Sequence, residues 1–354
     1  MMNWYSKTPG FKSCRLIAIT FWLFVGFNLV EAISQKVQVD IMSAEETEYY
    51  STRDSVDHFF DRVQPLEVSI QLQDSSIAHL TQPQAANQLQ AAMLHQGVEA
   101  KANEKLLSTI ESSMNEALRL SQPLLKMYPL PDTIRVGIIQ GDLYGPSVFY
   151  TRENGIYVPE PMAKAGNEQM LTDVLIHEIF HIQSRNYPEL QEKLYAHLGF
   201  KKLDLPIIYP DGFIPQTLLN PDGTDWDYYI PLSIDDKKVL AFPLIVSKKS
   251  HFDPDEPNFF SYLKFQLFPL QKQKGGYKLS YEGDFDGLDS KWMTPFFERI
   301  TKNTNYIIHP DELMADNFVL LTKWIESNKA PDKLSEPGKQ LLRKLAGEYQ
   351  VNLP

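Results

Sequence analysis

The chain has 354 residues and a formal net charge of −11, and its 43% hydrophobic and 22% charged residues exclude a disordered protein. No basic cluster interrupts this acidic balance, so we expect no nucleic-acid partner. The single cysteine, Cys14, excludes an intramolecular disulfide and any cysteine nucleophile or metal ligand beyond that position.

Residues 1–32 have the layout of a secretory signal peptide. An uncharged apolar run at residues 16–30 follows the basic residues Lys7, Lys12 and Arg15. Val30 and Ala32 then occupy the −3 and −1 positions of a possible cleavage site after Ala32. The run is shorter than the roughly 20 residues that span a bilayer. We therefore expect an exported protein, periplasmic or secreted, with no membrane span in the mature chain. An uncleaved signal anchor is the alternative.

The next region, residues 33–130, is predicted to be mostly helical. A helix is expected around residues 45–62, and residues 83–126 have the composition of one or two helices. Apolar and polar residues alternate at positions 66–72, which predicts a short strand. We interpret this region as helical packing; a removable inhibitory segment is the alternative.

From residue 131 the pattern changes to strands followed by long helices. Strands are predicted at residues 133–139, 148–151 and 155–158, and the last two are joined by a turn containing Asn154-Gly155. Asn167 can cap a helix that runs to about Arg185. A second helix, at about residues 189–198, is stopped by Gly199.

Residues 200–300 are predicted to be a loop-rich β insertion within a domain that spans residues 131–354. Many prolines separate strand-like segments at residues 239–246, 260–268 and 276–281. Pro310 can begin a helix that runs to about Ser327, and a last helix is expected at about residues 336–349. The expected fold class is α+β, with a small mixed sheet packed on the helix that Asn167 caps.

That helix carries the strongest functional motif of the sequence, HExxH, at residues 177–181. Residues four apart lie on one helix face, so His177 and His181 can bind one Zn²⁺ ion. Glu178 points to the neighbouring edge of that face and can reach a metal-bound water as general base. The alternative is a buried histidine pair with satisfied hydrogen bonds.

A catalytic zinc site needs a third protein ligand, and the best candidate is Glu312. Glu312 and Asp316 are four residues apart near the start of the Pro310 helix, so Asp316 can accept the N–H of a ligand histidine. Acidic residues are also favoured in the first helical turn by the helix dipole, which is the simpler explanation of either acid alone. His309 is an alternative ligand.

This constellation resembles the gluzincin group of zinc metallopeptidases, in which an HExxH helix is joined by a glutamate on a later helix that an aspartate follows four residues on. The resemblance covers about residues 131–199 and 300–330. It implies a zincin-like catalytic domain, one zinc ion on His177, His181 and Glu312, and a supporting role for Asp316. The linker between the two helices is longer than usual for the group, and Asp311 stands where an asparagine is expected.

The expected function is hydrolysis of peptide bonds in a peptide or protein substrate by a zinc-bound water that Glu178 activates. The donor to the developing oxyanion stays open among Tyr306, His309, Tyr228 and Tyr229. The strand at residues 155–158 is a candidate to pair with an extended substrate. The alternatives are a non-catalytic exported zinc protein that binds peptide or cell-wall material, and an exported protein with a chance motif.

Overall fold

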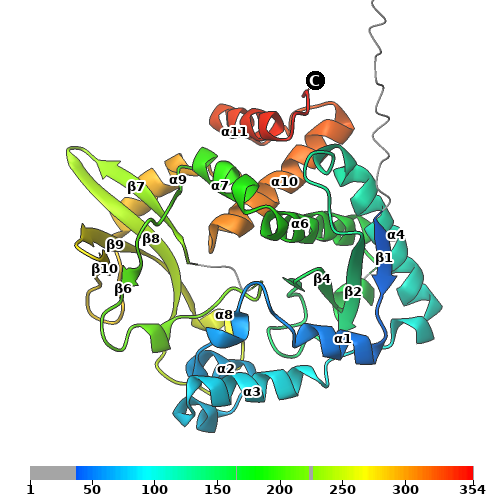
Figure 1. The fold of residues 1–354 in the computed structure, drawn as a ribbon, viewed down its shortest axis with the longest axis horizontal. Helices are drawn as coiled ribbons and strands as arrows, with labels where there is room; N and C mark the ends of the chain where they lie inside the picture. The colour runs from blue at the N-terminus through cyan, green and yellow to red at the C-terminus, as the bar shows by residue number, and fades with distance from the viewer. Residues whose placement is uncertain (1–36, 165, 223–225, 354) are drawn as a thin grey trace, which may run out of the picture. The chain divides into compact units, whose positions relative to one another are not determined.

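The computed structural model describes residues 37–164, 166–222 and 226–353, all within one compact unit, Gln35–Pro354. The expected signal peptide at residues 1–32 lies outside the described residues. The unit is a mixed α+β structure (Figure 1). None of the helices within the described residues is long and apolar enough to cross a membrane.

A four-stranded mixed sheet lies beside the long helices. Its strand order is β1–β2–β4–β3, in which the first three strands are parallel and β3 is antiparallel to β4. The strands are β1 (Gln38–Ile41), β2 (Thr133–Ile139), β3 (Tyr150–Arg152) and β4 (Gly155–Pro159). The three strands predicted from residue 131 onward are therefore present, whereas β1 comes from a segment in which the sequence predicted no strand.

Eleven α-helices are present within the described residues, and α4, α6 and α10 share the main hydrophobic core with the four-stranded sheet (Figure 1). The helices are α1 (Ala44–Ser51), α2 (Pro65–Gln71), α3 (Gln82–Met93), α4 (Glu104–Ser121), α5 (Glu160–Lys164), α6 (Glu168–Asn186), α7 (Pro188–His197), α8 (Phe259–Tyr262), α9 (Met293–Arg299), α10 (Pro310–Ser327) and α11 (Glu336–Glu348). Short 3₁₀ turns connect several of them.

Of the three predictions for the N-terminal part of the chain, the helices expected at residues 83–126 are present as α3 and α4, and the other two were wrong in their detail. Residues 66–72 belong to helix α2, which is buried on all sides, so its polar residues are as inaccessible as the apolar ones that alternate with them. The helix expected at residues 45–62 ends at Ser51. There Asp54 accepts the backbone N–H groups of Asp57 and Phe59 and turns the chain instead.

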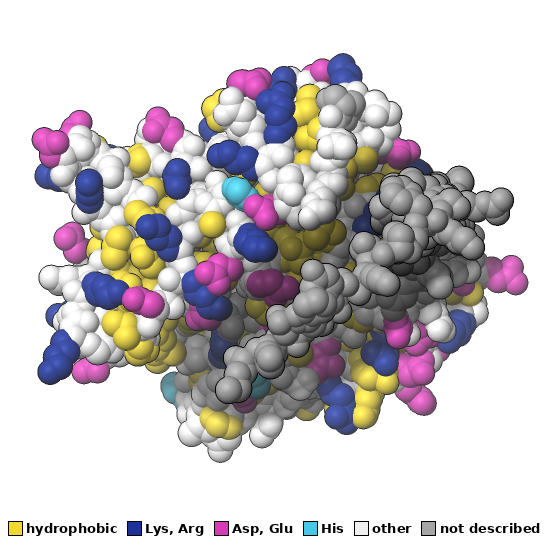
Figure 2. Space-filling view, turned by 45° about the horizontal axis from the view of Figure 1, so that its top comes forward, with side chains coloured by type: hydrophobic (Ala, Val, Ile, Leu, Met, Phe, Trp, Pro, Cys, Tyr) yellow, Lys and Arg dark blue, Asp and Glu magenta, His cyan; other side chains and the backbone are white. Residues whose placement is uncertain are grey.

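The region predicted as a β insertion forms a second, six-stranded sheet with the order β5–β7–β8–β9–β10–β6. Its strands are β5 (Lys201–Lys202), β6 (Ile207–Ile208), β7 (Tyr228–Ile234), β8 (Lys237–Ser247), β9 (Leu263–Gln273) and β10 (Gly276–Leu279). Long antiparallel pairing of β7, β8 and β9 and a separate hydrophobic core hold this sheet together. On the face shown in Figure 2, acidic and basic side chains are interspersed with hydrophobic ones.

Candidate metal centre

Helix α6 presents the two histidines of the motif on one buried face. The helix begins at the predicted cap, where the Asn167 side chain accepts the backbone N–H of Met170 at 3.0 Å. One helical turn separates His177 from His181, and their ring centroids lie 4.7 Å apart. Both side chains are buried, and so is Glu178 between them.

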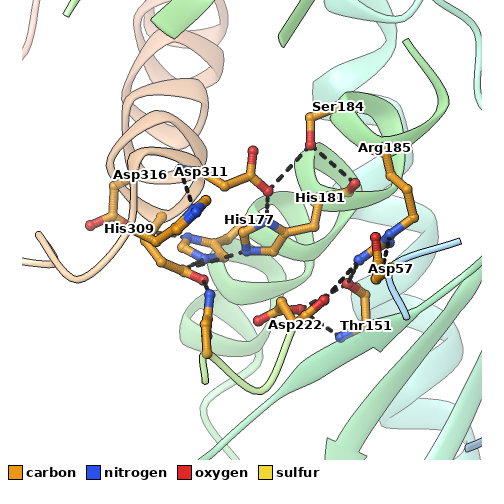
Figure 3. Close-up of polar contacts among 12 residues, drawn as sticks. Asp57, Thr151, His177, His181, Ser184, Arg185, Asp222, His309, Asp311 and Asp316 are labelled. Carbon is orange, nitrogen blue, oxygen red and sulfur yellow. Dashed lines mark hydrogen bonds and ion pairs between the residues drawn. The ribbon is translucent and has the colours of Figure 1, made fainter. Parts of the chain in front are cut away.

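Helix α10 brings Glu312 against this face, 135 residues beyond His177. Figure 3 shows Asp311 and Asp316 of the same helix beside the two histidines. Its Oε2 lies 2.9 Å from Nε2 of His177 and 3.5 Å from Nε2 of His181. Donor atoms that bind one metal ion tetrahedrally at about 2.1 Å are about 3.4 Å apart, close to both distances. The Nε2 atom of His181 is buried and has no hydrogen-bond partner in the described structure. These three residues could therefore hold a metal ion.

Two aspartates of α10 orient the histidines by binding their other ring nitrogens. Asp316 Oδ1 lies 3.0 Å from Nδ1 of His177, and Asp311 Oδ2 lies 2.7 Å from Nδ1 of His181. Asp311 also accepts the hydroxyl of Tyr195 from helix α7. A carboxylate on Nδ1 places the ring proton there and leaves Nε2 as the metal-binding atom.

The carboxylates of the centre stabilise positive charge on the histidines. Burial by itself lowers the pKa of His177, but the hydrogen bonds to Asp316 and Glu312 outweigh it and raise that pKa to about 10. Burial opposes the charge of Glu312 as well, yet the neighbouring histidines hold its pKa well below the usual value. Positive charge on the imidazole side and negative charge on the carboxylate side therefore stabilise each other here.

Glu178 has one oxygen without a hydrogen-bond partner, as His181 and Asn220 each have one such atom within the described residues. Its Oε2 is buried without a hydrogen bond in the described residues. Burial raises the pKa of Glu178 to about 8, and the nearby carboxylate of Asp222 adds to the rise. Glu178, His181 and Asp222 each offer an atom within 4.8 Å of the others. This arrangement suits a group that takes up and releases a proton.

A loop from the insertion region, residues 218–222, completes the centre from the side opposite to α10. The Asn220 amide donates a hydrogen bond to Oε1 of Glu312, the oxygen that does not face the histidines. Two residues on, Asp222 Oδ1 accepts the backbone N–H of Thr151 at 2.7 Å and its hydroxyl at 2.8 Å. The loop is held by Glu67 of α2, which accepts the backbone N–H of Leu219 at 2.9 Å.

A cleft of about 470 Å³ opens onto this centre. Its polar wall includes His177, Glu178, Asp222 and Glu312, and its apolar wall comes from several elements: Val148, Phe149, Met162, Val174, Phe260 and Val319. A second cavity, of about 230 Å³, lies on the other side of His181 and Asp311. The centre thus separates two cavities, of which only the first reaches Glu178.

The four candidates for an oxyanion donor lie in different places. Tyr306 lines the cleft, and its ring is stacked on His177 at a centroid distance of 6.0 Å. His309 caps α10 by accepting the N–H of Asp311 and lines the second cavity, as does Tyr228. Tyr229 packs against Tyr277 in the six-stranded sheet. Only Tyr306 therefore lies beside the catalytic candidate Glu178 among these four.

The strand predicted to pair with a substrate cannot do so, because β4 has β2 on one side and β3 on the other. The edge strands of the sheet are β1 and β3.

Sequence reasoning did not find the supporting residues Asp311, Tyr195, Asn220 and Asp222. Asp311 precedes Glu312 directly and was noted only as a departure from a family pattern. Asn220 and Asp222 flank Pro221 in a segment that predicts a turn, and no periodicity or spacing connects them to the histidines. Comparisons with protein-family models, curated proteins and solved structures gave no match to this chain.

Proposed function

We propose that the protein is an exported zinc metallopeptidase of the gluzincin type, with zinc on His177, His181 and Glu312. The observation that carries the proposal is the approach of both Nε2 atoms to one oxygen of Glu312, next to an unpartnered oxygen of Glu178. Two imidazoles and one carboxylate match the donor set of catalytic zinc sites, which leave one position for water.

The bound ion would supply Lewis acidity, lowering the pKa of water and polarising a carbonyl. The residues of the chain supply the proton transfers and the positioning. Glu178 lines the cleft, accepts a proton from the attacking water and then returns it to the nitrogen of the leaving amine. Tyr306 lines the cleft and is therefore the best-placed donor to the developing oxyanion. A tyrosine hydroxyl is protonated near pH 7 and can donate a hydrogen bond.

The test compares wild-type protein with Glu178→Gln and with Glu111→Gln, the same change at an exposed position of α4. We expect about one zinc per chain in all three by elemental analysis. Hydrolysis of a mixed peptide library, followed by mass spectrometry, should fall about 10²- to 10⁴-fold in Glu178→Gln alone.

Undiminished hydrolysis by Glu178→Gln would rule out the assigned base. Zinc bound by wild-type protein without turnover of any peptide would favour the non-catalytic binding protein instead. A wild-type chain that takes up no zinc would leave the motif without its proposed role.

A further inference from the structure

Only one part of helix α6 lines the cleft at the centre. From helix α6 it is lined by Asp173, Val174, His177 and Glu178, all in the first part of the helix. The residues of the next turns, among them Ser184 and Arg185, line the second cavity instead. Glu178 is the last of these residues along α6, and it lies close to Asp222, which lines the same cleft from the loop at residues 218–222.

The edge of the four-stranded sheet is closed at the same point. Thr151 in β3 lies opposite Ile156 of β4, and its N–H points away from β4 to Oδ1 of Asp222. Peptide substrates commonly add to an exposed sheet edge through backbone hydrogen bonds. With this N–H already bound by Asp222, a substrate strand cannot extend along β3 beyond Thr151.

Two acidic side chains, Asp222 and Glu178, meet in this part of the cleft. Asp222 and Glu178 present carboxylates to the cleft within 4.8 Å of each other. The nearest guanidinium, that of Arg185, lies behind the loop, where it donates to the backbone oxygen of Asp222 at 3.2 Å and pairs with Asp57 at 2.6 Å. A terminal carboxylate would be repelled here, whereas an ammonium group would find an acceptor.

We propose that Asp222 binds the free α-ammonium group of the substrate, so that the protein removes residues from the N-terminus of peptides. The inference rests on the proposed peptidase function and names its substrate class. The α-nitrogen lies about 2.5 Å from the carbonyl carbon of the same residue, so a carboxylate beside Glu178 can reach it while that carbonyl is attacked. Water adds to the first carbonyl carbon, the first peptide bond breaks, and the leaving nitrogen takes the proton from Glu178.

The decisive variant is Asp222→Asn, because the amide oxygen can still accept from Thr151 while the negative charge is gone. Asp236→Asn, at an exposed position of the turn between β7 and β8, is the matched control. Each protein is given one peptide in two forms, with a free and with an acetylated N-terminus. Wild type and control should release only the first residue, from the free form. In Asp222→Asn we expect kcat/KM for the free form to fall about 10- to 100-fold, mainly through KM, at unchanged zinc content.

Equal cleavage of the two forms, or cleavage at interior bonds, by the wild type would overturn the inference while leaving the peptidase function intact. Loss of zinc in Asp222→Asn would show that Asp222 is a metal ligand and would also overturn it. Binding can be measured without turnover by calorimetric titration of the zinc-loaded Glu178→Gln variant with the same two peptides. The free form should bind at least about 10-fold more tightly, and equal affinities would contradict the inference even if no peptide is hydrolysed.

Discussion

The candidate metal centre is built from two helices and a loop, and the sequence predicts the helices better than the loop. Helices α6 and α10 bring His177, His181 and Glu312 together through fixed helical spacing. The loop at residues 218–222 brings Asn220 and Asp222 to the same place through hydrogen bonds to three other elements: α2, β3 and α10. Helical geometry makes the candidate metal ligands recognisable, while the residues that shape the cleft depend on tertiary contacts.

This difference predicts that the helix pair tolerates changes less well than the loop. The largest effect is expected for Asp311→Ala. Asp311 is 1% exposed and receives hydrogen bonds from His181 and Tyr195, so its removal leaves two buried donors without an acceptor. We expect a loss of about 3–5 kcal/mol in the free energy of unfolding. Metal affinity should fall about 10- to 100-fold.

Chemical denaturation of the metal-free protein and competition with a chelator measure the two quantities. Asp311→Asn serves as the comparison, because it keeps an acceptor and loses the charge. A loss below about 1 kcal/mol in Asp311→Ala would show that the carboxylate is not needed to hold the helix pair.

The anchor of the loop makes a prediction that depends on pH. Burial raises the pKa of Glu67 from 4.5 to about 8, against the hydrogen bonds from Leu219 and Gln71 that lower it. The folded protein therefore keeps this proton between about pH 4.5 and 8, where the unfolded chain has lost it. Its contribution to stability is complete below pH 4.5 and is lost as the pH rises toward 8.

Glu67→Gln removes this titration, so the difference in unfolding free energy between variant and wild type should shift by up to about 1.4 kcal/mol per pH unit in that range. Urea denaturation at pH 5, 6, 7 and 8 measures the difference. A constant difference across these pH values would show that Glu67 stays charged in the folded protein.

The sequence predicted the helices of the centre almost to the residue. Asn167 and Pro310 begin α6 and α10, and helix termini have local chemical causes. It also predicted that Glu312 and Asp316 would face the histidines, because spacing of three or four residues fixes a helix face.

The remaining parts could not be predicted, because they depend on burial and on contacts distant in sequence. Glu67 is a polar residue of an entirely buried helix, and nothing local distinguishes its position from an exposed one. Strand β1 alternates Gln38 and Asp40 with Val39 and Ile41, but four residues are too few for this pattern to stand out, and the strand pairs with the parallel edge of β2. Asp222 meets Thr151 across a separation of 71 residues, a pairing that no local pattern encodes.

The smallest of these effects, and the most direct test of the loop, is expected for Asn220→Ala. The Asn220 amide holds Oε1 of Glu312 while Oε2 faces the histidines, so it fixes the orientation of the carboxylate without touching the imidazoles. We expect a metal affinity about 10-fold lower, the low end of what supporting residues contribute. Asn87→Ala, at an exposed position of α3, is the control. Chelator competition on both variants measures the effect. Affinity lost from Asn220→Ala alone would mean that the loop takes part in building the metal centre, whereas equal affinities would mean that the two helices suffice and the loop only shapes the cleft.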